Sequence, residues 1–64
     1  MDGKYVVKFG RGYLRHIKEN VTFAEITIVL AIDKADFLEL DQALKIKEKF
    51  GGKVLKIGLE LEEV

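Results

Sequence analysis

The sequence predicts a small α+β domain in which a small antiparallel sheet has one helix packed on one face. Three observations predict this fold class. A β-branched and aromatic run turns at glycines, an amphipathic segment ends at Gly51-Gly52, and the residues after it alternate with a period of two. In chain order the elements are β-β-β-α-β. The 64 residues form a single domain, 1–64, because so short a chain buries only about 60% of its unfolded surface.

The N-terminal third predicts a β-hairpin. Residues 4–9 are rich in β-branched and aromatic side chains, which favour a strand. Gly10-Arg11-Gly12 supplies the turn, since either glycine can take a positive φ without steric cost. Residues 13–18 return as the second strand. Alternation along the two strands predicts one face made of Tyr5, Val7 and Phe9, and another made of Tyr13, Arg15 and Ile17.

The middle of the chain, residues 22–32, gives two conflicting signals. Thr22-Phe23-Ala24-Glu25 has the form of a helix capping box, and Val21 with Ile26 could form the hydrophobic staple around it. Residues 26–32 are instead mostly β-branched and apolar, which is typical of a strand covered on both faces. We predict a strand, and the helix is the alternative that the sequence leaves open.

A helix is predicted over residues 40–50, with its C-cap at Gly51 in the left-handed conformation. The apolar face of this helix consists of Leu40, Ala43, Leu44, Ile46 and Phe50.

The last strand is predicted over residues 53–61, and the tail after it is expected to fray. Its apolar face, which we expect to lie against the helix, consists of Leu55, Ile57, Leu59 and Leu61.

Composition excludes several kinds of site. The chain has no cysteine and one histidine, His16, so neither a disulfide nor a zinc site can be assembled from it. We expect no cofactor and no metal. No apolar run approaches the roughly 20 residues that span a bilayer, and no signal segment opens the chain. These features predict a cytoplasmic protein without a membrane partner.

The charge is balanced in total and uneven along the chain. Residues 1–20 carry five basic and two acidic side chains, whereas residues 21–64 carry six basic and nine acidic ones. In the basic hairpin, Lys8, Arg11, Tyr13 and Arg15 interleave cations with an aromatic ring, as in sheets that bind single-stranded nucleic acid. The zero net charge favours the alternative, in which the aromatic rings belong to the core and the cations are solvated.

No constellation of catalytic residues is present in the sequence. His16 has no nameable partner to orient its ring, and Gly10-Arg11-Gly12 lacks the following helix of a phosphate-binding loop. The acidic residues before the helix suit the positive end of its dipole, and their spacing is not that of a calcium loop. They are Asp33, Asp36, Glu39 and Asp41. We therefore predict that the protein is not an enzyme.

From Lys4 onward the chain resembles a group of short uncharacterised proteins from phages and prophages of Gram-positive bacteria. The residues that carry this resemblance are Lys4-Tyr5-Val6-Val7-Lys8, a glycine turn before Tyr13, then Ala35, Phe37 and Ala43, and finally Phe50-Gly51-Gly52-Lys53-Val54. The segment 24–32 is more apolar than the corresponding part of that group. The resemblance implies a phage accessory protein and implies no catalytic residue.

Together these observations predict a non-enzymatic interaction protein that binds another protein and forms a homodimer. We expect Ile26, Ile28 and Leu30 to make the self-association surface, because so small a core cannot cover every apolar residue of the middle segment. The alternative is a single-stranded nucleic-acid-binding module that uses residues 4–18.

Overall fold

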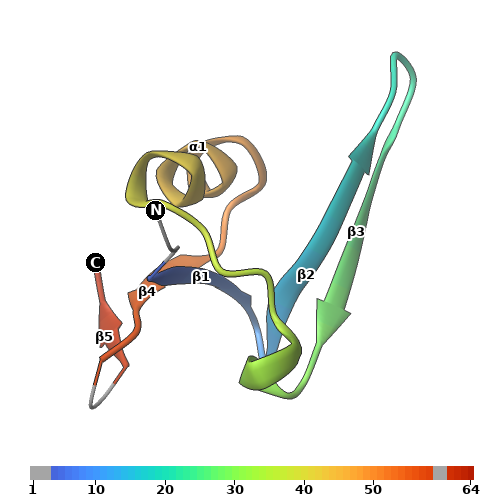
Figure 1. Cartoon of the computed structure of the whole chain (residues 1–64). Coiled ribbons are helices and arrows are strands. Elements are labelled where there is room, and N and C mark those ends of the chain that lie inside the picture. The colour runs from blue at the N-terminus through green and yellow to red at the C-terminus, as the bar shows by residue number, and fades with distance from the viewer. Residues whose placement is uncertain (1–3, 59–60) are drawn as a thin grey trace.

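The computed structural model describes residues 4–58 and 61–64. Within these ranges the chain forms a five-stranded antiparallel sheet, in the order β3-β2-β1-β4-β5, with an α-helix on one face (Figure 1). The predicted fold class is thus confirmed. The elements are β1 (Tyr5–Phe9), β2 (Gly12–Glu19), β3 (Ala24–Val29), the 3₁₀ helix η1 (Ile32–Lys34), α1 (Leu40–Phe50), β4 (Lys53–Lys56) and β5 (Glu62–Glu63).

The predicted β1–β2 hairpin is present, and its two glycines have different roles. Phe9 lies opposite Gly12, so Gly10 and Arg11 form a two-residue loop. Gly10 has φ 62° and Arg11 has no positive φ, and a positive φ at the first loop residue alone is the signature of a type II′ turn. Gly12 lies in the strand, where a Cβ would collide with Cγ2 of Ile28. Gly10 therefore makes the turn, and Gly12 makes room for β3.

A β-bulge at Arg15 changes the faces of β2. The pairing with β3 shifts between Leu14 and His16, so Arg15 is the extra residue. Leu14 and Ile17 consequently point to the side of the sheet that faces α1, whereas Tyr13 packs on the opposite side. The predicted common face of Tyr13 and Ile17 is wrong, because one inserted residue reverses the alternation.

Beyond the bulge, β2 and β3 leave the rest of the sheet. β1 and β2 pair only at Lys8–Tyr13 and Phe9–Gly12. The segment 36–38 then fills the widening gap, since the Asp36 amide donates to the Leu14 carbonyl at 2.9 Å and Leu38 forms a β-bridge with Tyr5. We call residues 15–29 the arm; Figure 1 shows it projecting past the end of α1.

The side of the sheet that faces α1 holds the main apolar cluster. Val7, Leu14 and Val54 are buried there, and Val7 lies opposite Val54 across the β1–β4 pairing. Tyr5 and Phe9 pack against the same cluster, which confirms the predicted core face of the first strand. From the helix side, Ala43 is buried and Ile46 packs against the cluster, and Leu38 is its remaining buried member.

A second apolar cluster lies on the opposite side of the sheet. Val6 and Leu55 face each other across the β1–β4 pairing and are buried with Ala35. Ile32 of η1 packs against them, so the segment after β3 covers this side. The prediction that Leu55 and Ile57 contact the helix is wrong: Val54 points to α1 and both of these residues belong to the far cluster.

The predicted last strand is two short strands. β4 ends at Lys56, and β5 pairs back onto it with Glu63 opposite Leu55. The Val64 amide donates to the Val54 carbonyl at 2.8 Å, so the tail is paired and does not fray. Leu61 is exposed, contrary to its predicted place in the core. Leu59 lies outside the described residues.

The helix has the predicted bounds, but the conformation of its C-cap residue, Gly51, differs from the predicted one. Glu39 is the N-cap residue, and its amide donates to Oε1 of Gln42 at 3.2 Å. At the other end, Gly51 adopts φ 87° and ψ −160°. This extended conformation is open only to glycine and is not the left-handed C-cap that was predicted. The Gly51 amide donates to the Lys47 carbonyl at 2.8 Å.

Candidate interaction surface on the arm

The middle segment forms a strand, β3, which resolves the choice between strand and helix. It was predicted to be covered on both faces, and this is wrong. β3 lies at the edge of the sheet, and five of its six residues are exposed. The edge position follows from the hairpin connection, because β3 pairs with β2 and β2 pairs with β1 on its other side. An edge strand with this composition is unusual, since natural edges are protected by lysine, proline or bulges.

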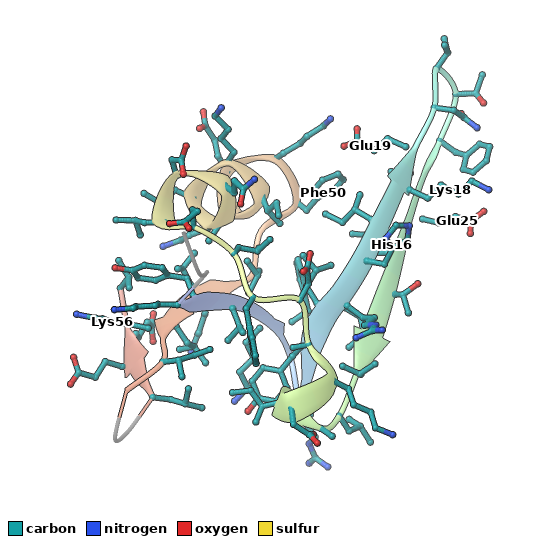
Figure 2. The ribbon with its side chains drawn as sticks, in the orientation of Figure 1. His16, Lys18, Glu19, Glu25, Phe50 and Lys56 are labelled. Carbon is teal, nitrogen blue, oxygen red and sulfur yellow. The ribbon has the colours of Figure 1, made fainter. Side chains whose placement is uncertain are left out.

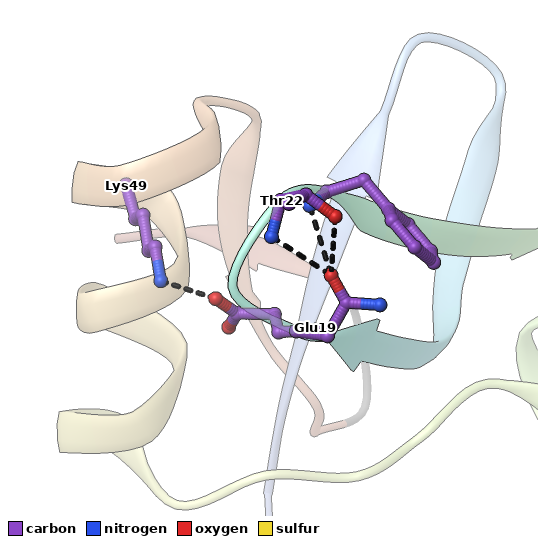
Figure 3. Close-up of polar contacts among 5 residues, drawn as sticks. Glu19, Thr22 and Lys49 are labelled. Atoms are coloured by element: carbon purple, nitrogen blue, oxygen red, sulfur yellow. Dashed lines mark hydrogen bonds and ion pairs between the residues drawn. The ribbon is translucent and has the colours of Figure 1, made fainter.

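A four-residue loop orders the tip of the arm. Oδ1 of Asn20 accepts hydrogen bonds from the amides of Thr22 and Phe23, at 2.9 and 3.1 Å, and from the Thr22 hydroxyl at 3.1 Å (Figure 3). The Asn20 amide donates to the Phe23 carbonyl at 2.9 Å. This arrangement is an Asx-type turn, in which a side chain replaces a backbone acceptor. It leaves Val21 fully exposed and Phe23 about half exposed, so the tip presents apolar surface.

The register of β2 and β3 assigns their side chains to two faces. Ile17 lies opposite Ile26 and Leu14 lies opposite Ile28, and directly opposed residues share a face. Ile26 and Ile28 therefore point to the side of α1. The other face pairs His16 with Thr27 and Lys18 with Glu25, and Figure 2 shows Lys18 and Glu25 on the outer side of the arm.

The predicted self-association residues are exposed. Ile26 and Ile28 are 37% and 40% exposed, and Leu30, which follows β3, is 79% exposed. We call these three residues the apolar stripe. Each is a large aliphatic residue, and burying such a side chain from full exposure is worth about 1.5–3 kcal/mol, of which Ile26 and Ile28 retain less than half. The stripe therefore offers a favourable contact to any partner that can cover it.

A groove of about 330 Å³ separates the arm from the C-terminal half of α1. Figure 2 shows Phe50 at the end of the helix and Glu19 on the arm, facing each other across this space. An ion pair between Lys49 and Glu19 spans the rim (Figure 3). Both side chains are largely solvated, so the pair adds little stability. The lining comprises Ile17, Glu19, Lys45, Ile46, Lys49 and Phe50.

The groove is a feature that sequence reasoning missed. Its two walls come from residues about thirty positions apart, such as Glu19 and Lys49. Ile17 reaches it only because the bulge at Arg15 turns that side chain toward α1. The apolar character of Ile46 and Phe50 was visible in the helical period. The wall formed by the arm was not visible in the sequence, because a bulge leaves no periodic signal in a single strand.

The predicted nucleic-acid residues lie near the start of the hairpin. Lys8 and Tyr13 are directly opposite on the side away from α1, and Arg11 is exposed in the turn. Tyr13 packs against the far apolar cluster. Nη1 of Arg15 donates to the Lys34 carbonyl at 2.7 Å, which ties the bulge to η1. The structure thus brings Lys8 and Tyr13 together and gives Arg15 a structural contact.

The remaining polar residues form no cluster of chemical interest. His16 is exposed on β2, opposite Thr27. Asp33 and Asp41 lie in the first turns of η1 and α1, and Glu39 caps α1. Over residues 4–58 and 61–64, no group of three or more His, Cys, Asp or Glu side chains is placed to hold a metal ion. The same residues include no helix with the length and apolarity needed to cross a membrane.

The molecular surface is large for the chain mass. The accessible surface is 4861 Å² for 7.3 kDa, whereas the size scaling of compact monomers gives about 4,200 Å². The difference is roughly 700 Å². The principal extents of 39 × 23 × 21 Å show an elongated molecule, and the projecting arm contributes to that shape (Figure 1).

Comparison with known proteins gives no relative: no protein-family model, no curated protein and no solved structure matches the chain.

Proposed function

We propose that this chain is a non-enzymatic interaction protein that binds protein through its arm and forms a homodimer. The observation that carries this proposal is the position of the apolar stripe, with Ile26 and Ile28 on an exposed edge strand and Leu30 directly after it. An edge that is apolar and free of proline and lysine pairs readily with another chain. A phage or prophage accessory role, which the resemblance of the sequence suggests, completes the proposal.

The surface area supports the same proposal. The accessible surface exceeds that of a compact monomer of this mass by roughly 700 Å², so the projecting arm has surface that a partner could cover. The exposed large aliphatic residues in and just after β3 contribute apolar surface to the arm. Ile26 and Ile28 belong to neither of the two core clusters, so a partner that covers them leaves the packing of both clusters in place.

The chemistry of the groove favours binding over catalysis. Its lining offers Glu19 and two lysines among apolar side chains, and Glu19 is paired with Lys49. General acid–base catalysis needs a pair of groups held in a pocket with suitably matched pKa values. An exposed ion pair at the rim of an open groove is not a pair of catalytic groups held in a pocket.

Sedimentation across micromolar concentrations tests the proposal. We expect the native protein to sediment at twice the mass of the chain. Ile26→Lys, which places a charge in the apolar stripe, should give a monomer. Val21→Lys is the matched control, because it adds the same charge on a fully exposed residue at the tip. A native protein that stays monomeric at all concentrations contradicts the homodimer.

A second candidate function is binding of single-stranded nucleic acid at the start of the hairpin. The observation that favours it is the direct pairing of Lys8 with Tyr13 beside the exposed Arg11, which places two cations next to an aromatic ring. A salt titration with a single-stranded oligonucleotide tests it. Binding that weakens steeply with salt, and weakens further in Lys8→Ala, supports this function. Absence of binding at low salt rules it out.

A further inference from the structure

We propose that two copies of this chain join their β3 edges antiparallel about a two-fold axis at Thr27, which makes one continuous ten-stranded sheet. This inference rests on the proposed homodimer and specifies its geometry. β3 has no neighbour on its outer side among the described residues. Its six residues, Ala24–Val29, include one charged side chain and neither proline nor lysine. The unpaired backbone groups of such an edge favour a strand from another chain.

The second copy is the occupant that the composition of β3 favours. Two β3 strands placed antiparallel bring β-branched aliphatic residues against each other, and such cross-strand pairs stabilise a sheet. A two-fold arrangement also continues the face that bears α1 from one copy to the other. Both helices then cover the same side of the joined sheet. The apolar stripes of the two copies meet between the helices. The exposed Ile26 of each copy then contacts the exposed Ile28 of the other copy.

Symmetry and charge select the register. The faces of the two copies match only when opposed residue numbers have an even sum, because alternate side chains point to opposite faces. An axis at Glu25 places two carboxylates face to face, which is unfavourable. An axis at Ile28 leaves only three residues of each β3 in the pairing. The axis therefore lies at Ile26 or Thr27, each of which pairs five residues.

The position of Glu25 decides between these two. With the axis at Ile26, each Glu25 lies opposite Thr27 of the second copy, and the two carboxylates become diagonal neighbours at about 7–8 Å. With the axis at Thr27, Glu25 lies opposite Val29 and four residues separate the carboxylates along the strand, roughly 13 Å. The same register places Ile26 opposite Ile28 of the second copy and the two Thr27 hydroxyls opposite each other. Threonine pairs of this kind are favourable across strands.

Single cysteines test the register directly, because the chain has no native cysteine. Residues opposed across antiparallel strands have Cα atoms about 4.5–5.5 Å apart, within the range that a disulfide spans. We expect Thr27→Cys to form a disulfide-linked dimer under mild oxidation. Thr22→Cys, at the exposed tip of the same arm, is the matched control and should stay monomeric on a denaturing non-reducing gel.

A third variant identifies the competing register. Ile26→Cys should form at most a small fraction of linked dimer when the axis lies at Thr27. Preferential linking through Ile26→Cys overturns the Thr27 axis. Equal linking in Thr27→Cys and Thr22→Cys indicates random collision and overturns the edge pairing altogether.

Charge at the axis gives an independent measurement in solution. Thr27 is exposed in the single chain, so Thr27→Lys should leave the monomer folded while placing two ammonium groups face to face in the dimer. We expect the dimer dissociation constant to rise at least tenfold. Thr27→Val keeps the branched shape and removes only the hydroxyl pair, so it should change the dissociation constant far less than Thr27→Lys does. A native dimer that is unaffected by Thr27→Lys and is not linked through Thr27→Cys overturns this geometry alone, whereas a native monomer overturns the homodimer itself.

Discussion

Gly12 shows how a single missing side chain positions the edge strand. A Cβ at Gly12 would collide with Cγ2 of Ile28 and would lie 3.2 Å from the Val29 carbonyl oxygen. Ile28 therefore sits on β2 only because Gly12 has no side chain. The sequence indicated a glycine for a turn at this position, and the turn needs Gly10 instead. The difference depends on a contact between strands, which a local pattern does not contain.

Gly12→Ala should destabilise the protein, because overpacking of a fitted contact costs about 1–3 kcal/mol. Urea unfolding monitored by circular dichroism measures the loss. The matched control is the double variant with Ile28→Ala. Cβ of Ile28 would lie 3.6 Å from the new Cβ, an ordinary contact, so the truncation removes the collision. The double variant should lose less stability than the sum of the two single variants. Additive losses contradict this role of Gly12.

The two glycines after the helix differ in what surrounds them. Gly51 and Gly52 both have positive φ, 87° and 92°, which alone costs a non-glycine residue about 1–3 kcal/mol. A Cβ at Gly51 would meet open space, whereas one at Gly52 would lie 2.9 Å from both the Lys8 carbonyl oxygen and the Phe9 ring. We expect Gly52→Ala to reduce the free energy of unfolding more than Gly51→Ala does. Equal losses in urea unfolding contradict the close approach of the backbone at Gly52.

At the scale of the elements, agreement between sequence and structure depends on how local each signal is. The bounds of α1 and of the first hairpin follow from periodicity and from glycine positions, and both were predictable. The division of residues 53–64 into β4 and β5 was not, because alternation continues through the bend at Gly58. The faces of β2 and β4 also escaped prediction. They depend on the bulge at Arg15 and on the register with β1.

The apparent capping box in the middle segment has a different structural role. Thr22 contributes its amide and its hydroxyl to an Asx-type turn whose acceptor is Asn20. Asn20 lies two residues before Thr22, outside the capping pattern. The turn fixes the connection between β2 and β3, and β-branched residues from Ile26 onward then favour a strand. A helix signal of four residues is therefore overridden by an adjacent turn.

Asn20→Ala should loosen the tip of the arm without unfolding the body. The substitution removes an oxygen that accepts three hydrogen bonds, two of them from the amides of Thr22 and Phe23. The loop is exposed, so we expect a cost of about 1 kcal/mol. Hydrogen exchange should accelerate at those two amides and remain unchanged at Val7. Asn20→Asp keeps the accepting oxygen and should preserve protection; equal acceleration in both variants contradicts the role of this oxygen.

At the scale of the whole molecule, the candidate interaction surface was partly predictable. Composition indicated that Ile26, Ile28 and Leu30 exceed what a small core can cover, and all three are exposed. The small size of the core explains only part of this exposure. The sheet buries apolar residues on both sides, Val7 with α1 and Val6 with the segment after β3. The stripe remains exposed because the arm leaves this body beyond the bulge, a geometric result that composition does not contain.

The proposed homodimer predicts that thermal stability depends on protein concentration. A partner copy that binds only the folded chain stabilises it by mass action. Each tenfold increase above the dissociation constant then adds about 1.4 kcal/mol per dimer, or about 0.7 kcal/mol per chain. For a domain of this size, that corresponds to roughly 3–5 °C in Tm. Differential scanning calorimetry over a hundredfold range of concentration measures the shift. In Thr27→Lys the rise of Tm should begin at a concentration at least tenfold higher than in the native protein, because its dimer dissociation constant is at least tenfold larger. A native Tm that does not change with concentration contradicts a dimer at these concentrations.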